Sequence, residues 1–153
     1  MNNIKTYPLF IRSKNILSID YGTKFVGLAS FFEGNAPFPM PYSRLKNVDE
    51  DCLIAEIKTI ISLESFEIIV LGVPYYLDGN ESEMTKKIKL FGKKLEKSIY
   101  PIKVFYQDES LSSFEAEDRM KNSPKYNFKI NYKNIDALAA SIILEDWLKS
   151  FLK

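Results

Sequence analysis

The sequence predicts an α/β protein in which one mixed sheet is flanked by helices. Two observations support this fold class. Three short apolar segments separated by turn residues occupy the N-terminal part of the chain, and helical and extended patterns alternate after them. Three strands followed by helix, strand, helix, strand and helix fit a single sheet with helices packed on its faces. We therefore expect a mixed five-stranded sheet, with three antiparallel strands and then two parallel ones.

The first two strands are predicted at residues 15–20 and 24–32, joined by Tyr21-Gly22-Thr23. Two apolar segments on either side of a glycine turn are typical of a tight hairpin. Residues 34–41 include three prolines, which predict a turn into an edge-like third strand near residues 42–45.

The first helix is predicted from Asp49 onward, where the apolar period changes. Its apolar residues recur at helical spacing: Leu53, Ile54, Ile57, Ile60 and Ile61. Residues 67–73 form a nearly continuous apolar run, which is typical of a central strand buried on both faces.

A second helix is indicated by the helical spacing of Met84, Ile88, Phe91 and Leu95. Residues 101–106 are the next predicted strand. The pattern Ser112-Ser113-Phe114-Glu115 is a capping box that predicts a third helix near residues 113–122. A loop at residues 121–134 precedes the last helix, which is predicted from Ile135 to about Phe151.

The length of 153 residues fits one domain, and we expect an N-terminal arm at residues 1–14 and a single domain at residues 15–153. The single cysteine, Cys52, excludes an internal disulfide framework and suits a reducing compartment. We expect a cytoplasmic protein in which Cys52 is a buried structural thiol. No apolar run approaches the length that spans a membrane.

The chain has no histidine, which removes Ser-His and Cys-His catalysis and the commonest zinc sites. Carboxylate, lysine and tyrosine side chains remain for acid–base and metal chemistry. A net charge of +1 gives no global signature of polyanion binding. Any affinity for nucleic acid must therefore come from a local basic patch or from metal ions.

Acidic residues stand at the ends of predicted elements: Asp20 after the first strand, Asp108-Glu109 after the last strand, and Asp136 in the first turn of the last helix. An unpaired charge at the tip of a buried strand is costly, so Asp20 indicates that a cation binds there. Ligands collect beyond the carboxyl ends of strands in such sheets, where Asp20 and Asp108-Glu109 both lie. Adjacent residues point to opposite faces, so only one of Asp108 and Glu109 would face the site.

Each acid also has a purely structural interpretation. Asp136 could be favoured at a helix start by the helix dipole, Asp108 or Glu109 could be ordinary turn acids, and Asp20 could cap the bend at Gly22. A shared site requires the three side chains to meet within a few ångströms in the fold. Paired carboxylates repel one another, and a hard divalent ion such as Mg²⁺ or Mn²⁺ reverses that repulsion. Two such ions can activate a water and stabilise the leaving oxygen in phosphodiester cleavage.

Two segments could contact the substrate. Gly22-Thr23-Lys24 could offer N–H groups, a hydroxyl and an ammonium to a phosphate, or could be a β-turn with a solvated lysine. The second segment interleaves cations with aromatic rings: Lys121, Lys125, Lys129 and Lys133 with Tyr126, Phe128 and Tyr132. Such a tract can hold phosphates and stack bases, or can be a solvated loop.

Four segments, in this order and spacing, resemble the YqgF/RuvX family of bacterial proteins. They are residues 19–29 (IDYGTKFVGLA), 70–74 (VLGVP) with Asp78-Gly79, 108–113 (DESLSS) with Glu115-Ala116, and 135–140 (IDALAA) running into Ile143-Leu144. The match covers about residue 15 to the C-terminus. The family typically has an arginine after its Asp-Glu pair, where this chain has Ser110.

The resemblance implies a ribonuclease H-like fold and a metal-dependent nuclease that processes the 5′ end of the pre-16S ribosomal RNA. It implies that Asp20, Glu109 and Asp136 are the catalytic, metal-binding acids, with Mg²⁺ or Mn²⁺ as the cofactor. The candidate substrate contacts are Gly22, Thr23, Lys24, Ser112 and Lys133. Expected partners are nucleic acid (pre-rRNA or branched DNA) and ribosomal particles, with no membrane, and the protein is expected to be a monomer or a homodimer.

Three alternatives stay open. The same site could resolve Holliday junctions. The Asp-x-Gly-Thr opening is shared with nucleotide-binding proteins of the actin/sugar-kinase superfamily, although this chain is too short for both halves of that fold. A catalytically silent RNA-binding or scaffold protein would also fit the pattern.

Overall fold

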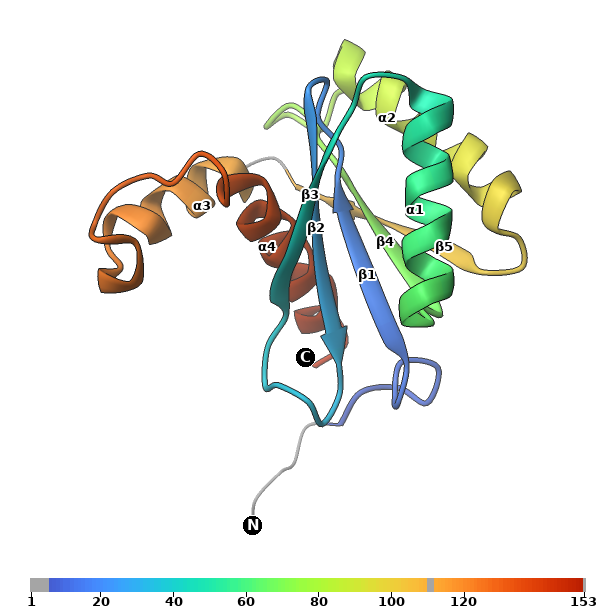
Figure 1. Ribbon diagram of the computed structural model, residues 1–153, viewed down its shortest axis with the longest axis horizontal. Coiled ribbons are helices and arrows are strands. Elements are labelled where there is room, and N and C mark those ends of the chain that lie inside the picture. Colours follow the sequence, from blue (N-terminus) through green and yellow to red (C-terminus); the bar gives the residue numbers. More distant parts are fainter. Residues whose placement is uncertain (1–5, 110–111, 153) are drawn as a thin grey trace.

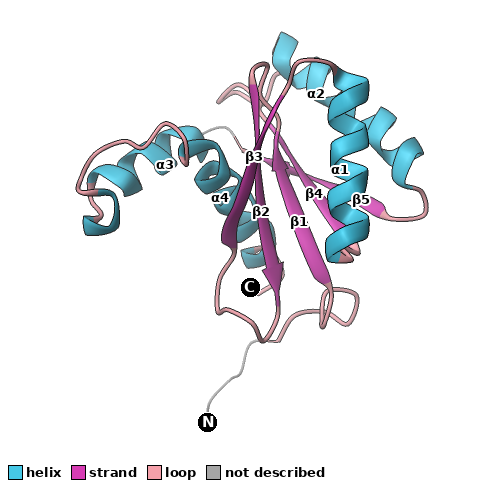
Figure 2. Ribbon diagram, viewed as in Figure 1, coloured by secondary structure: helices cyan, strands magenta, loops and turns pink. Residues whose placement is uncertain are grey.

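The computed structural model describes residues 6–109 and 112–152, without the side chains of residues 112–114. A five-stranded sheet lies between two helical layers, with α1 and α2 on one face and α4 on the other (Figures 1 and 2). The elements follow in this order: β1 (Asn15–Asp20), β2 (Phe25–Phe32), β3 (Met40–Lys46), α1 (Glu50–Glu64), β4 (Ile68–Val73), α2 (Glu83–Ile99), β5 (Lys103–Asp108), α3 (Ser112–Lys121), the short 3-10 helix η1 (Pro124–Tyr126) and α4 (Ile135–Lys149). None of the described helices is long and apolar enough to cross a membrane.

The strand order is β3-β2-β1-β4-β5, which puts β1 at the centre of the sheet. β2 runs antiparallel to β1 and to β3, whereas β4 runs parallel to β1 and to β5. This is the mixed sheet that the sequence predicts, so the predicted fold class is confirmed.

The side chains of β1 alternate between two cores, as expected for a strand that is covered on both faces. Leu17 and Ile19 face α1 and α2, and Ile16 faces α4. Ser18 also faces α4, where its buried hydroxyl donates a 2.7 Å hydrogen bond to the carbonyl of Ala140. The same alternation puts Asp20, the last residue of β1, on the α4 side of the sheet.

Helix α1 begins at a capping residue. The carboxylate of Asp49 accepts hydrogen bonds from the backbone N–H of Asp51 (2.8 Å) and of Cys52 (3.1 Å). The buried stripe of the helix starts one residue later, at Leu53, and Cys52 is exposed. The prediction that Cys52 is a buried structural thiol is therefore wrong, because the residue precedes the apolar face of its helix.

Strand β5 begins and ends two residues later than predicted, at Lys103 and Asp108. Helix α2 continues to Ile99 and residues 101–102 form a turn, so that pairing with β4 starts only at Lys103. The shift brings Asp108 into the strand and leaves Glu109 as the first residue beyond it.

Residues 6–14, the described part of the predicted arm, form turns that pack against the α4 face of the sheet. Ile11 is fully buried. The ring of Tyr7 meets Phe31 edge-on at 5.9 Å between centroids, and Phe10 stacks on Phe105 at 6.0 Å. The division of the chain at residue 14 stays a prediction.

Helix α4 meets the sheet at Gly27 of β2. A Cβ atom on Gly27 would lie 1.9 Å from the carbonyl oxygen of Asp136 and 2.9 Å from the backbone nitrogen of Ala137. The first turn of α4 can therefore occupy this place only if residue 27 has no side chain. Gly27 is paired with Asp20 across β1 and β2, so this contact also brings the start of α4 to the end of β1.

We expect Gly27→Ala to lower the free energy of unfolding by about 1–3 kcal/mol, because the added methyl group must displace α4 from β2. Urea denaturation followed by circular dichroism measures the change. Ser30→Ala in the same strand is the control and should change stability by less than about 0.5 kcal/mol. Equal stability of Gly27→Ala and the wild-type protein would contradict the contact between Gly27 and α4.

Candidate functional site

The carboxyl groups of Asp20 and Glu109 lie in direct contact at the carboxyl ends of β1 and β5. They share a side-chain hydrogen bond, which two carboxyl groups can form only when one of them is protonated. The pKa of Asp20 is raised well above its ordinary value of 3.8, first by burial and then by the charge and the hydrogen bond of Glu109. The charge of Asp136 adds a smaller effect of the same sign. Asp20 keeps some contact with solvent, although protein atoms surround most of its carboxyl group.

The end of β5 and a glycine in β4 determine where Glu109 lies. The backbone N–H of Glu109 donates to the carbonyl of Val73 at 3.1 Å, which continues the parallel pairing past Asp108. Phe105 packs on the α4 side of the sheet, so alternation puts Glu109 on that side as well. A Cβ atom on Gly72 would lie 3.0 Å from Cδ of Glu109. The Glu109 side chain thus lies over Gly72, where a larger residue would obstruct it.

Asp136, the second residue of α4, approaches the site over β2. It is half-buried, and burial raises its pKa, while the nearby guanidinium of Arg44 acts in the opposite direction. Arg44 is paired with Gly27, and Gly27 is paired with Asp20, so these residues form one row across β3, β2 and β1. The third acid is therefore within electrostatic range of Asp20 and beside an arginine.

The donor atoms of the site suit a hard divalent cation. They are carboxylate oxygens, which Mg²⁺ and Mn²⁺ prefer. The pKa of Asp20 is raised first by burial and then by the negative charge of Glu109 and Asp136, and a cation would relieve the second of these causes. Within residues 6–109 and 112–152, no three acidic or thiol side chains are close enough to hold a metal ion as they stand. Asp20 and Glu109 form the close pair, and Asp136 would have to approach them to complete a set of three.

The turn after β1 has a fixed backbone and exposed side chains. The side-chain amide of Asn47 donates to the carbonyl of Gly22 at 2.9 Å, and its backbone N–H donates to the carbonyl of Lys24 at 2.8 Å. A Cβ atom on Gly22 would lie 2.3 Å from the carbonyl oxygen of Phe25, so the turn requires glycine there. Thr23 and Lys24 are exposed near the end of β1. Their contact with substrate stays a prediction.

Lys133 lies in the segment that leads into α4, close in sequence to Asp136. It is exposed, and it lines a groove together with Arg44, Lys125 and Tyr126. Ser112 is the first residue of α3, and its side chain lies outside the described part of the structure. The substrate-binding roles of Lys133 and Ser112 stay predictions, and Ser110 lies outside the described residues altogether.

Arg44, Gly27 and Gly72 contribute to the site and were not predicted from the sequence as site residues. A glycine inside a strand often marks a close approach of backbone or ligand, so Gly27 and Gly72 had a usable signal. Arg44 had none, because its position beside Asp136 depends on the register between β2 and β3.

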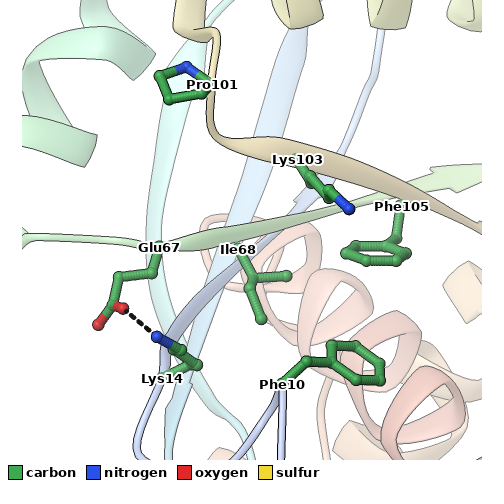
Figure 3. Close-up of a pocket in the computed structure, with 7 residues that line it drawn as sticks. All are labelled: Phe10, Lys14, Glu67, Ile68, Pro101, Lys103 and Phe105. Atoms are coloured by element: carbon green, nitrogen blue, oxygen red, sulfur yellow. Dashed lines mark ion pairs between the residues drawn. The ribbon is translucent and has the colours of Figure 1, made fainter.

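A cavity of about 580 Å³ lies at the other end of the sheet (Figure 3). Its walls include Phe10, Ile68 and Phe105, and the ion pair between Lys14 and Glu67, with 3.0 Å between Nζ and Oε2, lies at its edge. This cavity is near the amino ends of β4 and β5, whereas the acidic pair is at the carboxyl ends of β1 and β5. Glu67 is the single acid among its described lining residues and is neutralised by Lys14, so the cavity is not the candidate site.

Curated relatives match nearly the whole chain. A protein named "Putative pre-16S rRNA nuclease" from Maridesulfovibrio salexigens is 38% identical over 133 residues, which cover 87% of this chain and 96% of the relative. A protein of the same name from Rickettsia felis is 34% identical, over 96% of this chain and 94% of the relative. Another, from Orientia tsutsugamushi, is 37% identical, over 89% of this chain and 84% of the relative.

Solved structures share the fold at low sequence identity. Fowlpox virus resolvase in complex with Holliday junction DNA has a TM-score of 0.57 and 16% identity, over 91% of this chain and 99% of that one. T. thermophilus RuvC in complex with a Holliday junction has a TM-score of 0.55 and 11% identity, over 85% of this chain and 91% of that one. These similarities support the ribonuclease H-like fold that the resemblance implies.

A family model described as "RuvX: Holliday junction resolvase" matches residues 14–150. The matched region contains Asp20, Glu109 and Asp136 and all the strands of the sheet. The family model and the curated relatives both match most of the chain, so this protein belongs to the RuvX family of nucleases, with the ribonuclease H-like fold.

Proposed function

We propose that this protein is a divalent-metal-dependent nuclease that hydrolyses phosphodiester bonds at Asp20, Glu109 and Asp136. The observation that supports the proposal is the buried contact between the carboxyl groups of Asp20 and Glu109, with Asp136 in electrostatic range. Strongly shifted carboxyl pKa values in a cluster of acids are typical of functional sites. Separate structural roles do not account for the contact, because neither a turn acid nor a helix-start acid needs to face another carboxyl group.

The proposed metal is Mg²⁺ or Mn²⁺, held by Asp20 and Glu109 and completed by Asp136. When bound, such an ion supplies positive charge that stabilises a leaving oxygen and promotes ionisation of water. The chain itself holds the three acids in place: β1 holds Asp20, the pairing with Val73 holds Glu109, and the first turn of α4 holds Asp136. Because the pKa of Asp20 is raised, a cation that binds its ionised form displaces a proton at any pH below that raised pKa, so metal binding there is coupled to proton release.

The proposed reaction is maturation of the 5′ end of pre-16S rRNA, because relatives from three bacteria are named for a pre-16S rRNA nuclease. Ribosomal particles would then be partners, and the cytoplasm would be the compartment. In this proposal Gly22, Thr23, Lys24 and Lys133 position the substrate backbone.

Holliday junction resolution is the second candidate, supported by the description of the family model and by the similarity to two resolvases solved with junction DNA. Symmetric cleavage of a four-way junction requires two active sites and therefore a homodimer. Cleavage of an RNA precursor requires only one site. The oligomeric state in solution therefore bears directly on the choice between the two reactions.

We expect the wild-type protein with Mn²⁺ to cleave a pre-16S rRNA fragment at its 5′ flank, and to cleave a synthetic four-way junction more slowly. Gel analysis of both substrates under identical conditions, with light scattering to give the oligomeric state, measures the preference. Symmetric junction cleavage by a dimer, without RNA cleavage, would favour the second candidate instead.

We expect Asp20→Asn to reduce cleavage by at least about a hundredfold, because the amide cannot supply the negative charge that holds the cation. Initial rates at saturating Mg²⁺ and Mn²⁺ measure the loss, and isothermal titration measures metal binding. The control is Asp118→Asn on the exposed surface of α3, which should keep the wild-type rate. Full activity of Asp20→Asn would refute the assignment of the site.

We expect the stability of the wild-type protein, relative to Asp20→Asn, to fall as pH rises above the ordinary carboxyl pKa of 3.8 toward the raised pKa of Asp20. The folded protein binds the Asp20 proton more tightly than the unfolded chain does, because the folded pKa is raised above 3.8. Above that value the unfolded chain loses its proton first, which favours unfolding, whereas below it both states are protonated and the effect vanishes.

Urea denaturation across this pH range measures the difference between the two proteins. Saturating Mg²⁺ should diminish the difference, because the cation stabilises the ionised pair. A constant difference across the whole range would contradict the raised pKa of Asp20.

A further inference from the structure

The groove between β3 and the start of α4 continues the acidic site on the side of Asp136. Its lining includes Arg44 from β3, Lys125 and Tyr126 from η1, and Lys133 and Asn134 from the segment before α4. We propose that this groove, called here the β3–α4 groove, binds one unpaired strand of the nucleic-acid substrate. The inference rests on the proposed nuclease function and adds the class of substrate that the site accepts.

Charge supports this occupant. Arg44, Lys125 and Lys133 line the groove, and no carboxylate is among the described residues that line it. Arg44 acts on the charge of Asp136, but none of the three cations has a carboxylate oxygen within 4.0 Å in the described part of the chain, whereas Lys86, Lys89 and Lys94 of α2 all do. The groove therefore offers a local concentration of positive charge on a protein whose net charge is only +1. Such charge complements a phosphate backbone.

Arg44 is held in a fixed position in the groove. Its guanidinium lies 3.9 Å from the ring centroid of Phe25 and donates a 3.2 Å hydrogen bond to the carbonyl of Tyr132. The hydrogen bond to Tyr132 uses one of the five N–H donors of the guanidinium, so other donors can serve phosphate oxygens. Because the two contacts already restrain the side chain, we expect little side-chain entropy to be lost when a phosphate binds.

Aromatic side chains in the same segment provide stacking surfaces. The ring of Tyr126 is half-exposed in the groove, and Nζ of Lys125 lies 5.6 Å from its centroid. Phe128 and Tyr132, which follow in the chain, are 62% and 70% exposed. A cationic groove with exposed rings binds single strands, because unpaired bases can stack on the rings while their phosphates meet the cations.

The position of the groove suits a strand that passes the acidic site. Its volume is about 260 Å³, just below the range of roughly 300–1,000 Å³ that is typical of sites that enclose a small ligand. The groove also reaches Asn134 and Ala137, on either side of Asp136, so a strand that lies in it passes the acidic site.

The test is a binding measurement that does not depend on cleavage. Asp20→Asn protein in EDTA is titrated into a fluorescent single strand of about 12 nucleotides and, separately, into a duplex of the same sequence. Adding Lys133→Ala or Tyr126→Leu should weaken single-strand binding about tenfold and leave duplex binding nearly unchanged. Lys133→Ala should also reduce the slope of log K against log salt by about 0.7, whereas Tyr126→Leu should leave that slope unchanged.

The controls are Lys97→Ala, in a second basic groove between α1 and α2, and Tyr100→Leu, an aromatic residue that is 85% exposed. Both should keep full affinity for the single strand. Four results would overturn the inference. The groove variants could keep wild-type affinity, the control variants could lose as much affinity, the affinity for the duplex could fall equally, or the single strand could fail to bind. The proposed nuclease activity fails by a different result, which is absence of metal-dependent cleavage by the wild-type protein.

Discussion

Close approach of three chain segments at the end of β1 is the constraint on which the candidate site depends. Asp20 ends the central strand, and each neighbouring strand has a glycine beside it. Gly27 lets the backbone of Asp136 lie against β2, and Gly72 leaves space for the side chain of Glu109 over β4. A methyl group at position 27 would meet the backbone of α4, whereas one at position 72 would meet the side chains of Ile143 and Glu109, which would have to move. The convergence of the acids therefore depends most on Gly27. The packing of α4 and the geometry of the acidic cluster are therefore one property of the fold.

Convergence of acids has an electrostatic cost that shapes the site. Burial and the neighbouring carboxyl groups hold a proton on Asp20 well above its ordinary pKa, so the folded protein binds that proton in place of a second negative charge. Arg44 acts in the opposite sense on Asp136, where it favours the ionised form. Burial still raises the pKa of Asp136 overall, so Arg44 offsets only part of the cost of its charge. A divalent cation would favour the ionised form of both Asp20 and Asp136, and Asp136 would have to approach the pair to share it. A site that is stable in the folded protein and still responsive to a cation follows from these opposing effects.

The sequence was sufficient for the parts of the site that depend on local patterns. An apolar run ending in Asp20 predicts a buried strand, and alternation predicts that only one of Asp108 and Glu109 faces the site, because these properties follow from the two-residue period of a strand. The choice of Glu109 came from the family resemblance. The roles of Gly27, Gly72 and Arg44 depend on which residues lie opposite one another, and register is not encoded in a single strand. β2 and β3 even change register at a bulge between Leu28 and Ala29, next to the row that contains Arg44. The prediction that the Cys52 thiol is buried was wrong for a related reason. Helical periodicity predicts the spacing of the buried residues in a helix more reliably than it predicts which residue is the first of them.

Arg44 connects the acidic cluster to the surface beside it. It lies in the row that crosses β3, β2 and β1 through Gly27 to Asp20, and it contacts both Phe25 and the backbone of Tyr132. The segment before α4 is therefore attached to the sheet at the same row as the acids. If the groove and the acids were on separate elements, a bound strand could shift relative to the reacting phosphate, and effective positioning would be lost. Because one row of paired residues holds Arg44 and Asp20, a strand bound at Arg44 would be held in a fixed relation to the acids.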